Sequence, residues 1–157
     1  MQIKLPYDIT KPISGEASIE IDKSTQDVFD YIGVNFFENY PKWAEEVIEF
    51  EPLNGKEVFI GAKAKQVRQD NGDKVESIFE IIEYQSNCKL VFQGVSTPYR
   101  NSYLIENNER PLSTRLTFRF ELLEIEIFMR PFQKLLRTAI EDGAETIVDN
   151  LKNLLAA

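Results

Sequence analysis

The stretch FQKLLRTAIEDGAETIVDNLKNLL, at residues 132–155, decides the fold of this chain. Its apolar side chains recur every three or four residues, a spacing that places them on one face of an α-helix. That face consists of Phe132, Leu135, Leu136, Ala139, Ile140, Gly143, Ile147, Val148, Leu151, Leu154 and Leu155. We therefore predict a long amphipathic helix. It begins near Pro131, which a first helical turn tolerates, and its apolar face must be covered by another layer.

The covering layer is expected in the preceding part of the chain, because residues 47–127 read almost wholly as β-strands joined by turns. The dipeptide Asn71-Gly72 favours a two-residue hairpin turn. Counting outward from this turn pairs Lys63 with Glu80, Ala64 with Phe79, Gln66 with Ser77 and Arg68 with Val75. In this register the charged pair faces solvent, whereas the pair of Ala64 and Phe79 faces the long helix.

A second hairpin turn is predicted at Asn87-Cys88. The same count places the inward-facing positions of the next strand at Leu90, Phe92, Gly94 and Ser96. It also leaves Glu83 pointing inward, which a β-bulge in the preceding strand would correct. Two further strands are expected at residues 99–106 and 114–122.

The N-terminal part of the chain adds one strand and two short helices. Residues 1–15 are punctuated by prolines and a glycine and are expected to form an irregular arm. Residues 16–22 alternate as a half-buried strand, and Ser24 with Asp27 resembles the capping box that begins a helix. A second short helix is expected around Pro41. The prediction is one α+β domain over residues 1–157. Its curved antiparallel sheet of about seven strands wraps around the long C-terminal helix, an arrangement known as a helix grip.

Composition excludes several classes of function. The chain has 18 Lys and Arg against 26 Asp and Glu, and its net charge of −8 has the wrong sign for a nucleic-acid partner. It contains no histidine, which excludes His-dependent triads and histidine-ligated zinc. No phosphate-binding loop or metal motif is present, so we expect neither cofactor nor metal. The single cysteine, the lack of a signal-peptide pattern in residues 1–10 and the lack of a long apolar run predict a cytoplasmic protein without a transmembrane segment.

Several short motifs, in this order and at this spacing, resemble one superfamily. They are ASIEID at 17–22, DVFDYI at 27–32, YPKW at 40–43, IGA at 60–62, KLVF at 89–92 and LKNLL at 151–155. Over residues 16–155 the chain resembles the START-like superfamily, also called SRPBCC. Within it, the resemblance is to the polyketide cyclase/dehydrase and lipid-transport group. The resemblance implies the helix-grip fold but no particular reaction, and the missing histidine departs from some enzyme branches.

A ligand cavity is expected between the sheet and the long helix. Ala62, Ala64, Ser77 and Gly94 are small residues on the predicted inner face, where a packed interior would ordinarily hold larger ones. Polar residues such as Asn101 share that face, as in pockets that combine apolar walls with a few orienting groups. We expect the cavity walls to include Trp43, Gln66, Arg68, Phe79, Phe92, Tyr103, Phe118, Leu136, Ile140 and Gly143.

Alternatives remain for two of these residues and for the function. Arg68 either meets a carboxylate or extends to solvent at the end of its strand. Gly143 either leaves room for a ligand or allows close contact with the sheet. The first functional hypothesis is a module that binds a lipid, quinone or polyketide-like molecule. The second is a cyclase or dehydratase that uses Arg68, Tyr103 or an inward Glu83. The third is an interaction protein with a vestigial cavity and an acidic docking surface.

Overall fold

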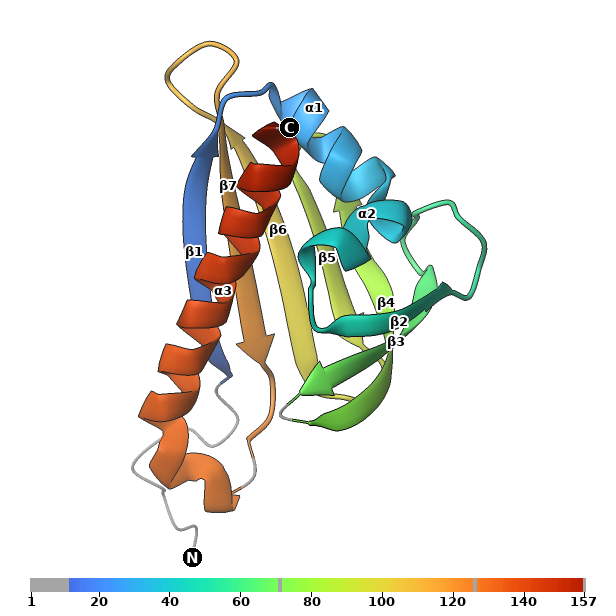
Figure 1. Cartoon of the computed structure of the whole chain (residues 1–157), viewed down its shortest axis with the longest axis vertical. Coiled ribbons are helices and arrows are strands. Elements are labelled where there is room, and N and C mark those ends of the chain that lie inside the picture. The colour runs from blue at the N-terminus through green and yellow to red at the C-terminus, as the bar shows by residue number, and fades with distance from the viewer. Residues whose placement is uncertain (1–11, 71, 126, 157) are drawn as a thin grey trace, which may run out of the picture.

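The structure of the chain is a computed structural model that describes residues 12–70, 72–125 and 127–156. Over these residues, seven strands form one antiparallel sheet in the order β1-β7-β6-β5-β4-β3-β2, and a long helix, α3, crosses one face (Figure 1). The elements are β1 (Ile13–Ile21), α1 (Thr25–Phe29), η1 (Asp30–Val34), α2 (Phe36–Trp43), β2 (Val47–Pro52), β3 (Lys63–Asp70), β4 (Asp73–Gln85), β5 (Lys89–Gly94), β6 (Tyr99–Asn107), β7 (Thr114–Leu122), η2 (Ile127–Phe132) and α3 (Gln133–Ala156). The predicted helix-grip fold is confirmed.

The hairpin of β3 and β4 has the predicted register. Lys63 lies opposite Glu80 and Ala64 opposite Phe79, and both members of the second pair are fully buried. The prediction that this pair faces the long helix is wrong, because the rings of Phe36 and Tyr40 of α2 pack against Phe79. The pairing continues to Asp70 and Asp73 at the turn. The local preference of Asn-Gly for a tight turn is therefore enough to set which face of each strand points inward.

The next hairpin differs from its prediction. Gln85 pairs with Lys89, so the connection contains three residues, and Asn87 adopts a left-handed conformation with φ of 58°. A further register shift lies between Ile81 and Glu83, at the position where the sequence suggested a bulge. The two shifts bring Phe92 opposite Ile81. The predicted inward position of Ser96 is wrong, because β5 ends at Gly94 and Ser96 is exposed in the following bend.

The N-terminal strand begins earlier than predicted. Ile13 is buried and pairs with Leu122 of β7, so residues 13–15 extend the sheet rather than belong to an arm. Residues 1–11 of the predicted arm lie outside the described residues. Ser24 caps α1 by accepting a hydrogen bond from the Asp27 backbone N–H at 3.1 Å, as its sequence position suggested.

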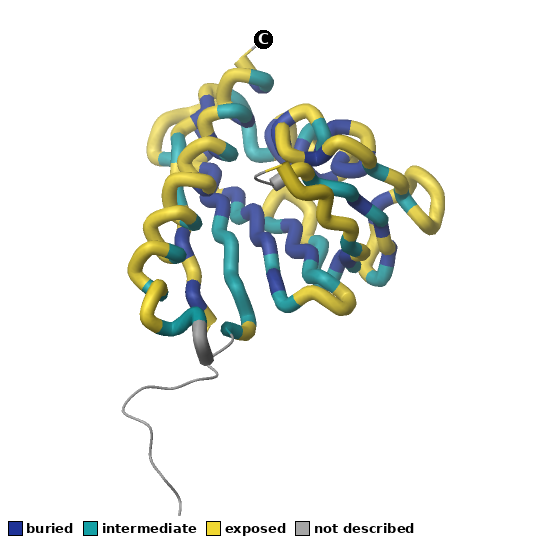
Figure 2. The backbone as a smooth tube through the Cα atoms, turned by 60° about the horizontal axis from the view of Figure 1, so that its bottom comes forward, coloured by how far each residue is buried: buried dark blue, intermediate teal, exposed yellow. Residues whose placement is uncertain are grey.

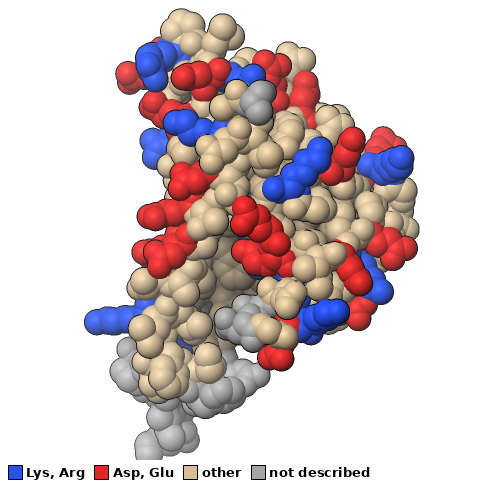
Figure 3. All heavy atoms as spheres, viewed as in Figure 1, with Lys and Arg blue, Asp and Glu red and all other residues tan. Residues whose placement is uncertain are grey.

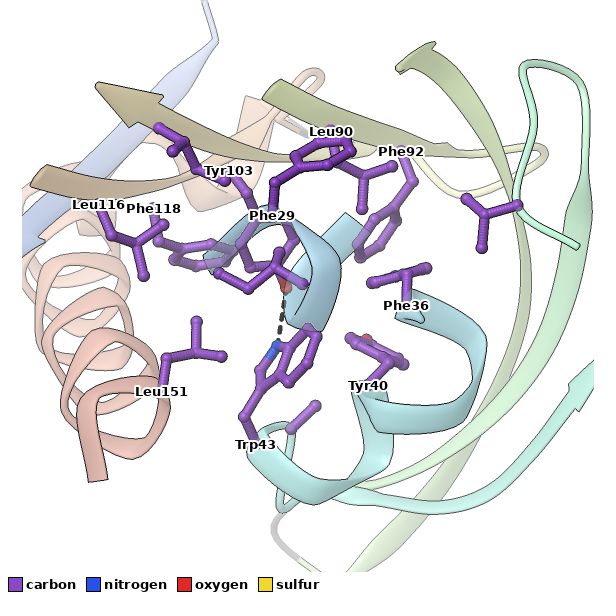
Figure 4. Packing of buried hydrophobic residues seen from close by; sticks show 14 of the residues in the cluster. Phe29, Phe36, Tyr40, Trp43, Leu90, Phe92, Tyr103, Leu116, Phe118 and Leu151 are labelled. Carbon is purple, nitrogen blue, oxygen red and sulfur yellow. Dashed lines mark hydrogen bonds between the residues drawn. The ribbon is translucent and has the colours of Figure 1, made fainter. Parts of the chain in front are cut away.

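The core is an aromatic cluster beneath the short helices, and in Figure 2 the middle strands and these helices carry most of the buried residues. Phe36 of α2 lies at ring-centroid distances of 5.3–6.3 Å from Trp43, Phe79, Phe92 and Tyr103. Figure 4 shows α2 presenting its rings to the sheet, with Leu151 of α3 pointing toward the same cluster. Helix α2 therefore fills the part of the concave face that lies over β4 and β5.

The small inner-face residues have a different role from the predicted one. Ala62 and Ala64 are fully buried members of this core. A side chain at Gly94 would collide with the Thr97 backbone oxygen and the Tyr99 ring. These positions are small because aromatic rings and a returning loop approach them closely, so they do not create the cavity.

Helix α3 follows a short 3₁₀ turn that contains Pro131, close to the predicted start. It packs mainly along β1 and to a lesser extent on β7, at one edge of the sheet. Among the described residues, no helix combines the length and the apolar character needed to cross a membrane.

Candidate ligand pocket

A pocket of about 400 Å³ opens between α3 and the sheet, where α3 and α2 leave part of the concave face uncovered. The space-filling view shows the surface hollowed beside α3 (Figure 3). Strands β6 and β7 form its floor, α3 forms one wall, and the end of α2 with the following loop and β3 forms the other. It is lined by Tyr40, Ala44, Glu46, Arg68, Asn101, Tyr103, Phe118, Phe120, Leu122, Leu136, Ala139, Ile140, Gly143, Ala144 and Ile147.

The residues predicted to line a cavity fall into two groups. Those that line the pocket are Arg68, Tyr103, Phe118, Leu136, Ile140 and Gly143. Those that lie behind its wall, in the aromatic core, are Trp43, Gln66, Phe79 and Phe92. The division follows from α2, which contributes Trp43 itself. Its Phe36 and Tyr40 pack against Phe79 and Phe92, and the Tyr40 hydroxyl donates to Gln66, an arrangement that strand alternation alone does not reveal.

Nine residues that line the pocket are not among the predicted cavity walls. Phe120 and Leu122 continue the inward alternation of β7, and Ala139, Ala144 and Ile147 extend the wall on α3. The alternation along β7 and the helical spacing along α3 indicate that these side chains face inward, as the alternation along β6 does for Asn101. No sequence signal identifies Tyr40, Ala44 and Glu46, because their position depends on how α2 packs over the sheet.

The two pocket tyrosines hold their hydroxyl groups in buried hydrogen bonds. Trp43 Nε1 donates to the Tyr103 hydroxyl oxygen at 3.0 Å, and the Tyr40 hydroxyl donates to Gln66 Oε1 at 2.8 Å. Burial raises the pKa of both Tyr40 and Tyr103 well above the ordinary tyrosine value. Both groups therefore stay neutral at physiological pH and present polar but uncharged surface to the pocket.

The two charged residues that line the pocket, Arg68 and Glu46, lie at its opening. Arg68 Nη2 lies 3.7 Å from Glu46 Oε2, and the two side chains are 36% and 48% exposed. Both alternatives for Arg68 are thus partly realised, because its guanidinium meets a carboxylate while remaining in contact with solvent. An exposed pair at this distance is weak, so either group is available to a molecule that enters.

Glycines at two positions show how α3 is placed. A Cβ on Gly15 of β1 would lie 2.8 Å from Ile140 Cγ2 and 3.0 Å from the Glu141 backbone nitrogen. A Cβ on Gly143 would meet nothing within 4 Å. Of the two interpretations of Gly143, open space is therefore correct, and the close contact between helix and sheet occurs at Gly15.

Glu83, considered for an inward catalytic role, lies on the other face of the sheet. Its Oε1 is 3.0 Å from Lys89 Nζ, within a group of polar residues that also includes Arg100 and Glu121. The register shift beside Glu83 turns it away from the pocket. Among the described residues, Glu46 is the one carboxylate that lines the pocket.

Comparison with known proteins identifies the same architecture. The model of the family described as polyketide cyclase / dehydrase and lipid transport matches residues 12–156. No curated protein matches the sequence. Among solved structures, the TTHA0849 protein of Thermus thermophilus is 17% identical with a TM-score of 0.72, covering 91% of this chain and 97% of its own.

Two further structures show how broadly this architecture is shared. A START superfamily protein from Mycobacterium smegmatis is 14% identical with a TM-score of 0.70, over 91% of this chain and 97% of its own. Truncated norcoclaurine synthase from Thalictrum flavum is 12% identical with a TM-score of 0.71, over 96% and 98%. At these identities the likeness shows the fold alone.

Proposed function

The chain belongs to the polyketide cyclase / dehydrase and lipid transport family, and we propose that it binds a hydrophobic or amphipathic small molecule in the pocket beside α3. The ligand classes that we consider are lipid, quinone and polyketide-like molecules. The observation that carries the proposal is the pocket itself. Its volume of about 400 Å³ lies within the range of roughly 300–1,000 Å³ that is typical of small-molecule sites.

The chemistry of the lining supports the same function. Two thirds of the lining residues are aliphatic, phenylalanine or glycine, and the polar groups are few and separated. Such a site gains affinity from burying apolar surface and uses the polar groups to orient the ligand. The family match adds that related chains are classed with lipid transport and polyketide chemistry.

Binding is favoured over the two alternatives. A cyclase or dehydratase needs a group that transfers protons beside the substrate. The carboxylate available in the described lining is Glu46, half exposed at the mouth, whereas Glu83 faces the other side of the sheet. An interaction protein with a vestigial cavity would have no reason to keep an open apolar pocket of this size.

Titration with N-phenyl-1-naphthylamine, an apolar probe that fluoresces when it leaves water, tests the proposal. We expect saturable binding to the wild-type protein. The variant Gly143→Leu places a side chain into the open space that faces Gly143 and should weaken binding roughly tenfold or more, about 1.4 kcal/mol or more. Native mass spectrometry of freshly purified protein would then identify a ligand carried from the cell.

Two matched variants separate pocket filling from damage to the fold. Thr138→Leu presents the same leucine side chain at an exposed position of α3 that does not line the pocket and should leave probe affinity unchanged. Ala64→Leu overfills the core and should lower stability by about 1–3 kcal/mol. The proposal fails if the wild type shows no saturable binding, or if Gly143→Leu binds as well as Thr138→Leu.

A further inference from the structure

Three asparagine or glutamine side chains are at least nine-tenths buried in the described part of the chain, and two of them have their hydrogen bonds within the protein. Gln66 accepts from the Tyr40 hydroxyl and donates to Tyr99 and Ser77. Asn39 donates to the Tyr31 backbone oxygen and accepts from Lys42. The third, Asn101, is 5% exposed, and its Oδ1 has no hydrogen-bond partner.

Asn101 lies on the floor of the pocket, on the inward face of β6. Its neighbours across the sheet are Phe92 of β5 and Phe120 of β7, so both flanks of the amide are aromatic. The side chain is part of the pocket lining. A hydrophobic residue would pack against these rings without the free-energy cost of an unpaired buried carbonyl oxygen.

The hydroxyl groups of Tyr99 and Tyr103, which flank Asn101 on the same face of β6, do not supply the missing donor. The Tyr99 hydroxyl lies 3.1 Å from Gln66 Nε2 and 3.3 Å from Ser77 Oγ. The Tyr103 hydroxyl lies 3.0 Å from Trp43 Nε1. Neither hydroxyl is paired with Asn101 Oδ1, and because Asn101 itself lines the pocket, a ligand bound there is the remaining source of a donor.

We propose that the pocket's ligand carries an uncharged hydrogen-bond donor, in the simplest case a hydroxyl group, which it presents to Asn101 Oδ1. This inference rests on the proposed binding function and narrows the ligand class. A purely hydrocarbon ligand would leave the oxygen unpaired. An ionised carboxylate would place oxygen against oxygen in apolar surroundings. An alcohol or a phenol satisfies the oxygen while its apolar body fills the pocket.

Three probes of similar size test the inference by calorimetry. 2-Naphthol carries the donor, 2-methoxynaphthalene keeps the oxygen but lacks the donor, and naphthalene has neither. We expect the wild-type protein to bind 2-naphthol roughly tenfold more tightly than 2-methoxynaphthalene, the difference that one buried hydrogen bond of ordinary strength supplies. In Asn101→Leu the ratio should fall to about one, with naphthalene binding retained.

A neighbouring variant provides the control. Ser102→Ala changes the next residue of β6, whose side chain lies on the opposite face among Arg100, Arg119 and Glu121, and should keep the wild-type ratio. Because the Asn101 oxygen is unpaired, Asn101→Leu should not lower the melting temperature.

The outcomes distinguish this inference from the proposed function. A wild-type ratio near one overturns the inference whatever the stability of the variant, and so does an Asn101→Leu protein that keeps the preference for 2-naphthol. Either result leaves the proposed function standing if naphthalene binds. Failure of all three probes to bind overturns the proposed function and the inference together.

Discussion

The two halves of α3 perform different tasks. Residues 144–156 contain every buried side chain of the helix, namely those of Ala144, Val148, Leu151 and Leu155. Asn150 Nδ2 also donates to the Trp43 backbone oxygen at 3.1 Å, which ties this half to α2. None of residues 133–143, all of them described, is buried, and Leu135 is 70% exposed. The C-terminal half anchors the helix in the core, and the N-terminal half forms most of the pocket wall on α3, which Ala144 and Ile147 continue.

The contrast shows that the apolar face of one helix can pack in the core along part of its length and line a pocket along the rest. The apolar stripe continues along the whole helix, but only its C-terminal part meets the aromatic core. Over the N-terminal part, α2 no longer covers the sheet, so the same kind of side chain faces a pocket. A binding wall that lacks buried contacts contributes little to folding stability, and it can therefore move or change with less effect on the fold.

The largest expected effect on stability comes from comparing two leucines of α3, one in each half. Leu151→Ala removes a fully buried side chain and should lower the free energy of unfolding by about 2–5 kcal/mol. Leu136→Ala, in the pocket wall, should lower it by less than about 1 kcal/mol. Urea unfolding of both variants measures the difference. Equal losses would mean that the pocket wall belongs to the core.

A smaller effect is expected where the wall touches the sheet. Gly15→Ala places a methyl group 2.8 Å from Ile140 Cγ2 and 3.0 Å from the Glu141 backbone nitrogen, so the helix or the strand must shift. We expect a loss of about 1–3 kcal/mol in unfolding free energy. Ser14→Ala, exposed on the other face of β1, should stay within about 0.5 kcal/mol. A neutral Gly15→Ala would show that this half of α3 is not held against β1.

The elements of the fold could be predicted because their signals are local. Asn71-Gly72 sets the β3–β4 register through its own backbone preference, and the period of residues 132–155 identifies α3. The β4–β5 register could not be predicted, because the left-handed Asn87 and the shift after Ile81 each add one residue.

The candidate site could be predicted only in part, for a similar reason. Alternation along the strands and the helix placed Tyr103, Phe118 and Ile140 on inward faces, and these residues line the pocket. Which inward positions lie under α2 and which under open space depends on tertiary packing. The sequence alone therefore did not separate Phe79 and Phe92, which are core residues, from the pocket lining.

The smallest expected effect has the opposite sign and concerns Gly143. This glycine is exposed in the middle of α3, at the boundary between the two halves, and a Cβ there would meet nothing within 4 Å. Gly143→Ala should therefore gain helix propensity without a clash and raise the free energy of unfolding by about 1 kcal/mol. A methyl group occupies little of the pocket, so affinity for N-phenyl-1-naphthylamine should change far less than in Gly143→Leu. A destabilised Gly143→Ala would instead place Gly143 in close contact with the sheet and close the space on which the proposed function depends.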